Sequence, residues 1–130
     1  MKKTQKMTKN FSLSEFKCKC GCEMPDNVKE NVKVLAENLQ IVRGILNEPI
    51  RINSAYRCVA HNKDIGGVSN SQHILGKASD VVISNISPDK VYTALDRLMD
   101  GKFISQGGLG KYNTFTHYDI RGHEARWSNV

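Results

Sequence analysis

Apolar residues recur with helical spacing between Pro25 and Pro49. Their separations alternate between four and three positions, which places them in one stripe along an amphipathic helix. The stripe consists of Val28, Val32, Leu35, Leu39, Val42 and Leu46. The two prolines bound the element because proline is excluded from a helix interior. The pattern predicts a long helix over residues 26–47 with one face in the core.

Shorter segments carry the patterns of β-strands. In "PIRINSAYR", Ile50 and Ile52 alternate with polar residues, which is typical of a half-buried strand that ends near Ser54. The run "ASDVVI" predicts a second strand. "KFISQGG" and "TFTHYDI" predict two more strands, joined by the glycine-rich "GGLGKYN". The last two strands therefore form a predicted antiparallel hairpin.

A second helix and an irregular crossing complete the predicted elements. Pro88 opens the helix, and Val91, Leu95 and Leu98 form its core-facing side. An aperiodic stretch, residues 58–76, joins the first two strands, and a crossing of this length in a small domain usually has a function. Helices and strands do not alternate regularly. The sequence therefore predicts an α+β fold, a small and largely antiparallel sheet with the long helix packed on one face.

The composition indicates an ordinary globular protein and changes the picture in one respect, its charge. The chain has 130 residues, 39% hydrophobic and 25% charged, and a formal charge of +6 that favours anionic partners. Part of the excess lies in "MKKTQKMTKN". We expect residues 1–10 to be a flexible basic tail and residues 11–130 to be a single domain. No nucleic-acid motif and no membrane-spanning stretch follow, so neither partner is expected.

The four cysteines form one tight group, Cys18, Cys20 and Cys22, and one distant partner, Cys58. "CKCGC" lacks the two-residue spacing of a zinc knuckle, and alternate residues of an extended segment project to one side. Three interpretations stay open: a structural four-thiolate metal site, one disulfide to Cys58, or reduced thiols. A cytoplasmic origin argues against the disulfide.

Two histidines and one aspartate have the chemistry of a zinc site. Asp80 stands directly before the apolar end of its predicted strand, where an unpaired charge is costly unless the side chain turns to solvent. His117 and Asp119 fall on one face of the last predicted strand. Together, His73, Asp80 and His117 form a ligand set that leaves one zinc position for water. Such a set is typical of a hydrolytic centre, since zinc activates water.

The same residues carry a resemblance to a known family. "SAYRCVAHNKDIGGVSNSQHILGKASDVVI" resembles the S-G-Y-R…N…G-G…S-x-H-x-x-G-x-A-x-D signature of peptidase family M15, the zinc D-alanyl-D-alanine carboxypeptidase family. "FTHYDIRGHEARW" looks like its closing F-V-H-x-D-x-R…R-W segment, and with "FSLSEFKCKCGC" the likeness covers most of the chain. The resemblance implies a hedgehog- or DD-peptidase-like fold, with His73, Asp80 and His117 as the zinc ligands.

The resemblance also implies residues that handle substrate. Arg57 falls where the family keeps an arginine for a substrate carboxylate or the developing oxyanion, which suits a planar guanidinium. A surface ion pair with Asp64 is the alternative for Arg57. Ser71 and Gln72 are predicted as donors lining the cleft, and Trp127 is expected to pack on the sheet or form part of the cleft wall.

The general base is a departure from the family pattern. Well-known members place an acidic residue three positions before the last histidine ligand, where this chain has Thr114. Asp119 is the predicted base because it shares a strand face with His117. Its alternative is a carboxylate that orients a histidine or pairs with Arg121. Glu124 is the reserve candidate.

The function implied by the resemblance is zinc-dependent hydrolysis of D-amino-acid-containing stem peptides of bacterial peptidoglycan. Either a D-Ala-D-Ala carboxypeptidase or an L-Ala-D-Glu-type endopeptidase is compatible with these residues. The opening lacks the apolar segment of a signal peptide, so we expect synthesis in the cytoplasm. We also expect a monomer. Action on the wall after release through a phage pore, as an endolysin, fits that expectation. The alternatives are a zinc-binding wall-recognition module without catalysis and a nucleic-acid protein built around "CKCGC".

Overall fold

The structure, a computed structural model, describes residues 6–130. The predicted tail, residues 1–10, lies partly outside this range. Within it, residues 8 and 10 contact the body of the protein, since Thr8 Oγ1 and the Asn10 amide N–H both donate to Gln40 Oε1, at 2.8 and 2.7 Å. The predicted division into tail and domain stays a prediction.

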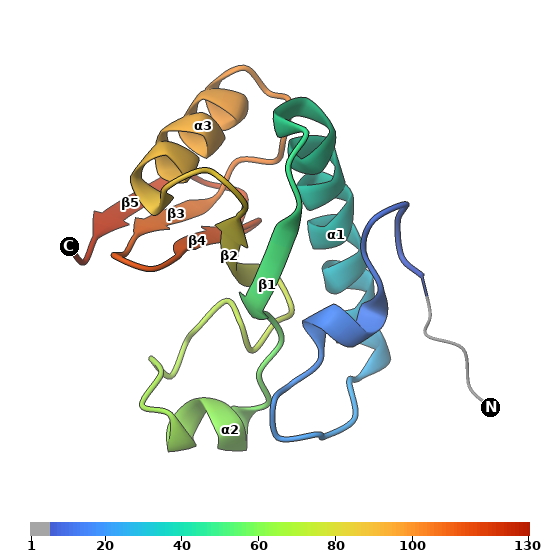
Figure 1. Ribbon diagram of the computed structural model, residues 1–130. Helices are drawn as coiled ribbons and strands as arrows, with labels where there is room; N and C mark the ends of the chain where they lie inside the picture. The colour runs from blue at the N-terminus through green and yellow to red at the C-terminus, as the bar shows by residue number, and fades with distance from the viewer. Residues whose placement is uncertain (1–5) are drawn as a thin grey trace.

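Helices and strands follow one another in an order that does not alternate regularly (Figure 1). The helical elements are η1 Leu13–Phe16, α1 Asp26–Leu46, α2 Val59–Asp64 and α3 Pro88–Asp100. The strands are β1 Ile50–Ser54, β2 Ala78–Ile83, β3 Gly108–Lys111, β4 Thr116–Asp119 and β5 Ala125–Ser128. None of the helices between residues 6 and 130 has the length and apolar character needed to cross a membrane.

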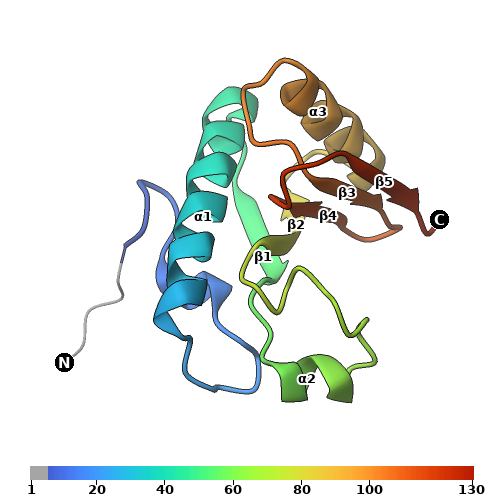
Figure 2. The same cartoon turned by 180° about the vertical axis from the view of Figure 1, so that it is seen from behind.

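The strands form one sheet in the order β1-β2-β4-β3-β5. Three of the strand pairs, β1–β2, β2–β4 and β3–β4, are antiparallel, and β3–β5 is parallel. The predicted α+β fold with a largely antiparallel sheet is therefore confirmed. Figures 1 and 2 show α1 running beside β1, while α3 lies at the other end of the sheet near β3 and β5.

One face of the sheet belongs to the core and the other carries polar residues. Val81 and Ile83 of β2, Leu109 of β3 and Tyr118 of β4 join the apolar core. The buried sides of α1 and α3 join the same core. Because successive strand residues point to opposite faces, Asp80 of β2 projects away from this core. The chemistry of the protein is therefore built on the sheet face opposite the apolar core.

The long helix follows its predicted stripe. Helix α1 buries Val28, Val32, Leu35, Leu39 and Val42, and Leu46 is half-buried at its end. Asn47 closes α1 in the left-handed conformation, at φ 52°, with its N–H donating to Arg43 O. Full burial of each large apolar side chain contributes about 1.5–3 kcal/mol, so this stripe is a main source of stability.

The prediction of a strand in "KFISQGG" is wrong. Residues 102–107 are irregular, and the strand β3 instead occupies Gly108–Lys111, inside the predicted connection. A Cβ at Gly108 would collide with the Asp119 carboxylate, and one at Gly110 would collide with the Trp127 indole. Glycine is needed at these two strand positions because bulky neighbours occupy the space that a side chain would take.

Three smaller differences concern a short helix, an edge strand and one core position of α3. The short helix α2 lies inside the predicted irregular crossing, and the parallel edge strand β5 was not predicted from the pattern. In α3, Val91 and Leu95 are buried as predicted, but Leu98 is only half-buried and Met99 takes the core position. The buried residues of α3 are therefore four positions apart, at 91, 95 and 99, and the predicted set had spacings of four and three.

Candidate active site

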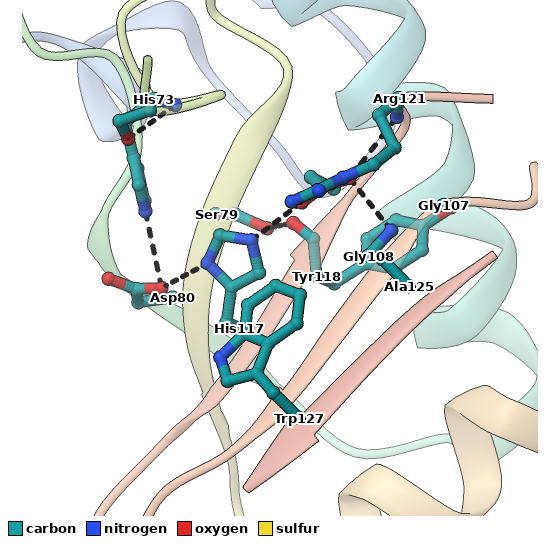
Figure 3. A network of polar contacts seen from close by, with 12 residues as sticks. His73, Ser79, Asp80, Gly107, Gly108, His117, Tyr118, Arg121, Ala125 and Trp127 are labelled. Atoms are coloured by element: carbon teal, nitrogen blue, oxygen red, sulfur yellow. Dashed lines mark hydrogen bonds and ion pairs between the residues drawn. The ribbon is translucent and has the colours of Figure 1, made fainter. Parts of the chain in front are cut away.

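Neighbouring strands place the predicted site residues in one row across the sheet. Asp80 of β2 is the direct partner of His117 of β4, and His117 is the partner of Gly110 of β3. Gly110 is in turn the partner of Trp127 of β5. Because directly opposed residues share a sheet face, the row brings Asp80, His117 and Trp127 together. Figure 3 shows these three side chains on one side of the sheet.

His73 reaches the row from the loop that precedes β2. Its Nε2 lies 3.3 Å from Asp80 Oδ1, and the side chain is buried. The loop turns at Gly76, which has φ +75° and lies so close to Val28 that a Cβ would meet the α1 backbone. The His73 carbonyl accepts the amide N–H of Arg57 at 3.1 Å. The loop is thus fixed against both α1 and the chain after β1.

The two imidazoles are each held by a hydrogen-bond acceptor on the far side of the ring. His73 Nδ1 lies 2.6 Å from the Ala55 carbonyl, and His117 Nε2 lies 2.7 Å from Asp119 Oδ2. Since a carbonyl and a carboxylate can only accept, both of these nitrogens carry the proton. In a neutral ring, His73 Nε2 and His117 Nδ1 then present lone pairs, and both face Asp80.

Three acceptor atoms therefore converge on one point. His117 Nδ1 lies 3.1 Å from Asp80 Oδ1, close to the 3.3 Å from His73 Nε2 to the same oxygen. Nitrogen and oxygen ligands around a tetrahedral Zn²⁺ are about 3.3 Å apart, given bonds of about 2.0–2.1 Å. The ligand atoms of these three residues all lie within 4.8 Å of one another. This buried group fits a metal ion such as zinc.

The electrostatics favour a positive charge at this point. Burial by itself raises the pKa of the Asp80 carboxyl, but the contacts with His117 and His73 outweigh it and hold the pKa well below its usual range. Burial lowers the pKa of His117, but Asp119 and Asp80 outweigh that effect and raise it. Two carboxylates flanking one imidazole therefore favour a cation there, whether a proton or a metal ion.

Asp119 is wholly buried behind His117. Oδ1 accepts the backbone N–H of Gly108 at 2.7 Å, and both oxygens accept from the Arg121 guanidinium at 2.9 and 2.7 Å. Burial raises the pKa of Asp119, but the hydrogen bonds from His117 and Arg121 outweigh it, so the pKa is lowered. These contacts fit the alternative expected for Asp119, a carboxylate that orients a histidine and pairs with Arg121. The side chain is not among the residues that line the cleft, where a general base would act.

Arg57 lies beside the candidate metal ligands. Nη2 is 3.4 Å from Asp80 Oδ2, Nη1 donates to Asn62 Oδ1 at 3.1 Å, and Nε donates to Ser54 Oγ at 3.3 Å. Among the described residues, Arg57 is paired with Asp80 and not with Asp64. The guanidinium is therefore fixed at the edge of the site, where the resemblance expects a substrate-binding arginine.

A cleft of about 410 Å³ opens onto the three candidate ligands. Ser71 and Gln72 are among its lining residues, and the Ser71 hydroxyl also accepts the backbone N–H of His73 at 3.1 Å. Trp127 lines the cleft, with its ring centroid 5.0 Å from that of His117. Both positions expected for this tryptophan are observed, because the indole also packs over Gly110 of the sheet.

The sequence interpretation missed two aromatic residues of the cleft wall. Tyr112 and Phe115 stack with ring centroids 4.4 Å apart, and both line the cleft. The Tyr112 hydroxyl accepts the indole N–H of Trp127 at 3.1 Å. Tyr112 lies in the predicted connection "GGLGKYN" and carried no signal. Phe115 lies in the predicted strand "TFTHYDI" on the same face as His117, and that shared face was its signal. Glu124, the reserve candidate for the general base, is exposed and does not line the cleft. The same is true of Thr114, which stands where well-known family members have an acidic residue.

Fold and site together define an α+β protein with a buried His-Asp-His group able to hold a metal at the floor of a cleft. The model of the Peptidase M15 family matches residues 9–119. The chain belongs to this metallopeptidase family. Over 54 residues it is 37% identical to the zinc D-Ala-D-Ala carboxypeptidase of Streptomyces albus G. The matched stretch makes up 41% of this chain and 21% of that relative.

Proposed function

We propose that this protein is a zinc-dependent peptidase that hydrolyses D-amino-acid-containing stem peptides of bacterial peptidoglycan. The observation that carries the proposal is the convergence of His73, Asp80 and His117, whose three acceptor atoms face one point on the cleft floor. Family membership supports a peptide substrate. The partial match to a zinc D-Ala-D-Ala carboxypeptidase supports zinc and a D-amino-acid substrate.

The proposed metal ligands are His73 Nε2, His117 Nδ1 and Asp80 Oδ1. Zinc held by these residues would polarise a substrate carbonyl and would lower the pKa of a bound water toward about 7. The protein supplies the rest of the geometry. Ala55 and Asp119 fix the two imidazole tautomers, which keeps both lone pairs aimed at the same point.

Arg57 is proposed to bind the substrate. Its guanidinium lies at the cleft edge with one N–H group on Asp80, so it can place a substrate carboxylate or a developing oxyanion next to the metal ligands. Ser71 and Gln72 are proposed to contact the peptide from the neighbouring loop. The stacked Tyr112 and Phe115 give the opposite wall an apolar surface for the peptide side chains.

Asp119 is proposed to orient His117 rather than to accept a proton from water. All of its hydrogen-bonding capacity toward the cleft is taken by His117 and Arg121, and its side chain is wholly buried. This assignment places Asp119 among the residues that position the site.

A role in lysis of the cell wall, as in a phage or prophage endolysin, is part of the proposal. The formal charge of +6 favours binding to anionic wall polymers. Both D-Ala-D-Ala carboxypeptidase and L-Ala-D-Glu-type endopeptidase activity are compatible with the cleft. Synthesis in the cytoplasm, release through a phage pore and action as a monomer complete the proposed setting.

A zinc-binding wall-recognition module without catalysis is the second candidate. The observation in its favour is that Asp80 is the carboxylate lining the cleft in the described chain, while Asp119 is shielded by His117. Such a protein would bind stem peptides through the same cleft and release no product.

Digestion of purified peptidoglycan, followed by mass spectrometry of the released peptides, tests the proposal. The expected result is a defined cut that disappears with a chelator, returns with Zn²⁺ and is absent for His73→Ala. The mass of the product distinguishes loss of a terminal D-alanine from an internal cut. A zinc-loaded wild-type protein that binds the wall and releases no peptide would establish the recognition module instead.

A further inference from the structure

The four cysteines of the chain gather at one place, and none of them lines the cleft. Cys18, Cys20 and Cys22 lie between η1 and α1, and Cys58 is the N-cap residue of α2. Their sulfur atoms all lie within 4.8 Å of one another. Two segments about forty residues apart along the chain therefore bring their thiols together.

The sulfur separations match a tetrahedral metal site. Cys18 Sγ lies 3.3 Å from Cys20 Sγ and 3.9 Å from Cys58 Sγ, and Cys20 and Cys58 are 3.5 Å apart. Four thiolates around Zn²⁺ at about 2.3 Å have sulfur atoms about 3.8 Å apart. All four cysteines are free thiols in the structure. We propose that Cys18, Cys20, Cys22 and Cys58 form a closed structural zinc site.

Backbone groups support thiolate ligands at this place. The N–H of Cys58 donates to Cys18 Sγ, and the N–H of His61 donates to Cys58 Sγ, both at 3.4 Å. Such donors offset part of the negative charge that thiolate ligands carry. Gly21, at φ +83°, lets the chain turn between Cys20 and Cys22 while its N–H donates to Cys18 O. The turn brings two thiols of a short loop onto one ion.

The donor set decides what the site does. Thiolate ligands select zinc over the oxygen-seeking Mg²⁺ and Ca²⁺. Four protein sulfurs leave no coordination position for water, so the ion has a structural and not a hydrolytic role. The site therefore differs in chemistry from the His73, Asp80 and His117 group, and it does not rest on the proposed peptidase function.

The position of the site connects it to Arg57. Cys58 follows Arg57 directly, and the backbone N–H of Tyr56 donates to Phe16 O at 3.0 Å on the other side. Asn62, which holds the Arg57 guanidinium, lies in the short helix that Cys58 caps. The zinc ion thus ties the loop of residues 17–22 to the segment that carries the proposed substrate-binding arginine.

Zinc content tests the site. The experiment compares the purified wild-type chain, the Cys20→Ser/Cys22→Ser double variant and the His73→Ala/His117→Ala double variant by elemental mass spectrometry. The Cys variant is expected to hold about one zinc ion less per chain than the wild type, whether or not the cleft is loaded. Lys19→Ala, an exposed neighbour in the same loop, is the matched control and keeps the wild-type content.

A second measurement on the wild type keeps the test decisive if the Cys variant fails to fold. Replacement of zinc by Co²⁺ is expected to give intense sulfur-to-metal charge-transfer bands, which survive in the His73→Ala/His117→Ala variant. Zinc content unchanged by the cysteine substitutions, cobalt protein without these bands, or a disulfide found by mass spectrometry would each overturn the site. Loss of peptidase activity alone, with the bands retained, would bear on the cleft only.

Discussion

The Trp127 indole lies against the His117 imidazole, with ring centroids 5.0 Å apart, above a strand position occupied by Gly110. A side chain at residue 110 would occupy the space of the indole. The tryptophan therefore shields a candidate metal ligand because the strand between them has no Cβ at that row. The absence of a side chain at Gly110 thus leaves room for a residue of the cleft wall.

Gly110→Ala is expected to displace Trp127 and destabilise the protein by about 1–3 kcal/mol, because the new methyl group overpacks the row. Trp127 is the single tryptophan of the chain, so its fluorescence reports the displacement directly. Urea denaturation of the variant and the wild type measures the change in the free energy of unfolding. Gly44→Ala is the matched control. Residue 44 lies in helix α1, a Cβ there would meet no other atom within 4 Å, and the substitution should stabilise the protein by about 0.5–1 kcal/mol. Equal effects at both positions would contradict the packing argument.

Asp80→Asn is expected to remove the cleft metal, because the neutral amide loses the charge that faces His73, His117 and Arg57. Zinc content should fall by about one ion per chain and peptidase activity by at least ~100-fold. Asp89→Asn serves as control, since Asp89 is exposed and pairs with Lys111. Retention of the cleft zinc in the Asp80 variant would exclude this residue as a ligand.

Asp119→Asn separates an orienting carboxylate from a general base. An amide cannot accept from His117, Arg121 and Gly108 as the carboxylate does, so the imidazole loses its fixed tautomer. Zinc affinity is expected to fall about 10–100-fold, measured by competition with a chelating dye. Activity should recover in part at saturating zinc. Unchanged zinc affinity together with a lost kcat would instead identify Asp119 as the proton acceptor.

Arg57→Lys is expected to weaken substrate binding more than catalysis. The guanidinium uses separate nitrogens for Ser54, Asn62 and Asp80, and an ammonium group cannot span these positions. KM for a peptide with a free carboxylate should rise about 10-fold or more, at an unchanged zinc content. Arg51→Lys, a substitution at an exposed residue of β1, should leave KM and kcat unchanged. A fall in kcat with an unchanged KM would assign Arg57 to the transition state.

The local patterns of the sequence were sufficient for the longest elements and for the ligand types. The α1 stripe fixed a helix, since burial of one face needs apolar residues at helical spacing. The alternation in "TFTHYDI" put His117 and Asp119 on one face, and the structure joins them at 2.7 Å. The family signature identified His73 and Asp80 as candidate ligands, because it specifies the types of the ligand residues and the spacing between them.

What the sequence could not determine depends on contacts between distant segments. The strand β3 needs glycine at residues 108 and 110 because Asp119 and Trp127 fill the space beside them, and no local pattern contains this fact. The burial of Asp119 behind His117, and the meeting of Cys58 with Cys18, arise from strand order and loop packing. The sequence by itself determined which side chains can bind a metal, through residue type and period. The tertiary structure decided which atoms face one another, because ligand geometry is set by the pairing of strands far apart in the chain.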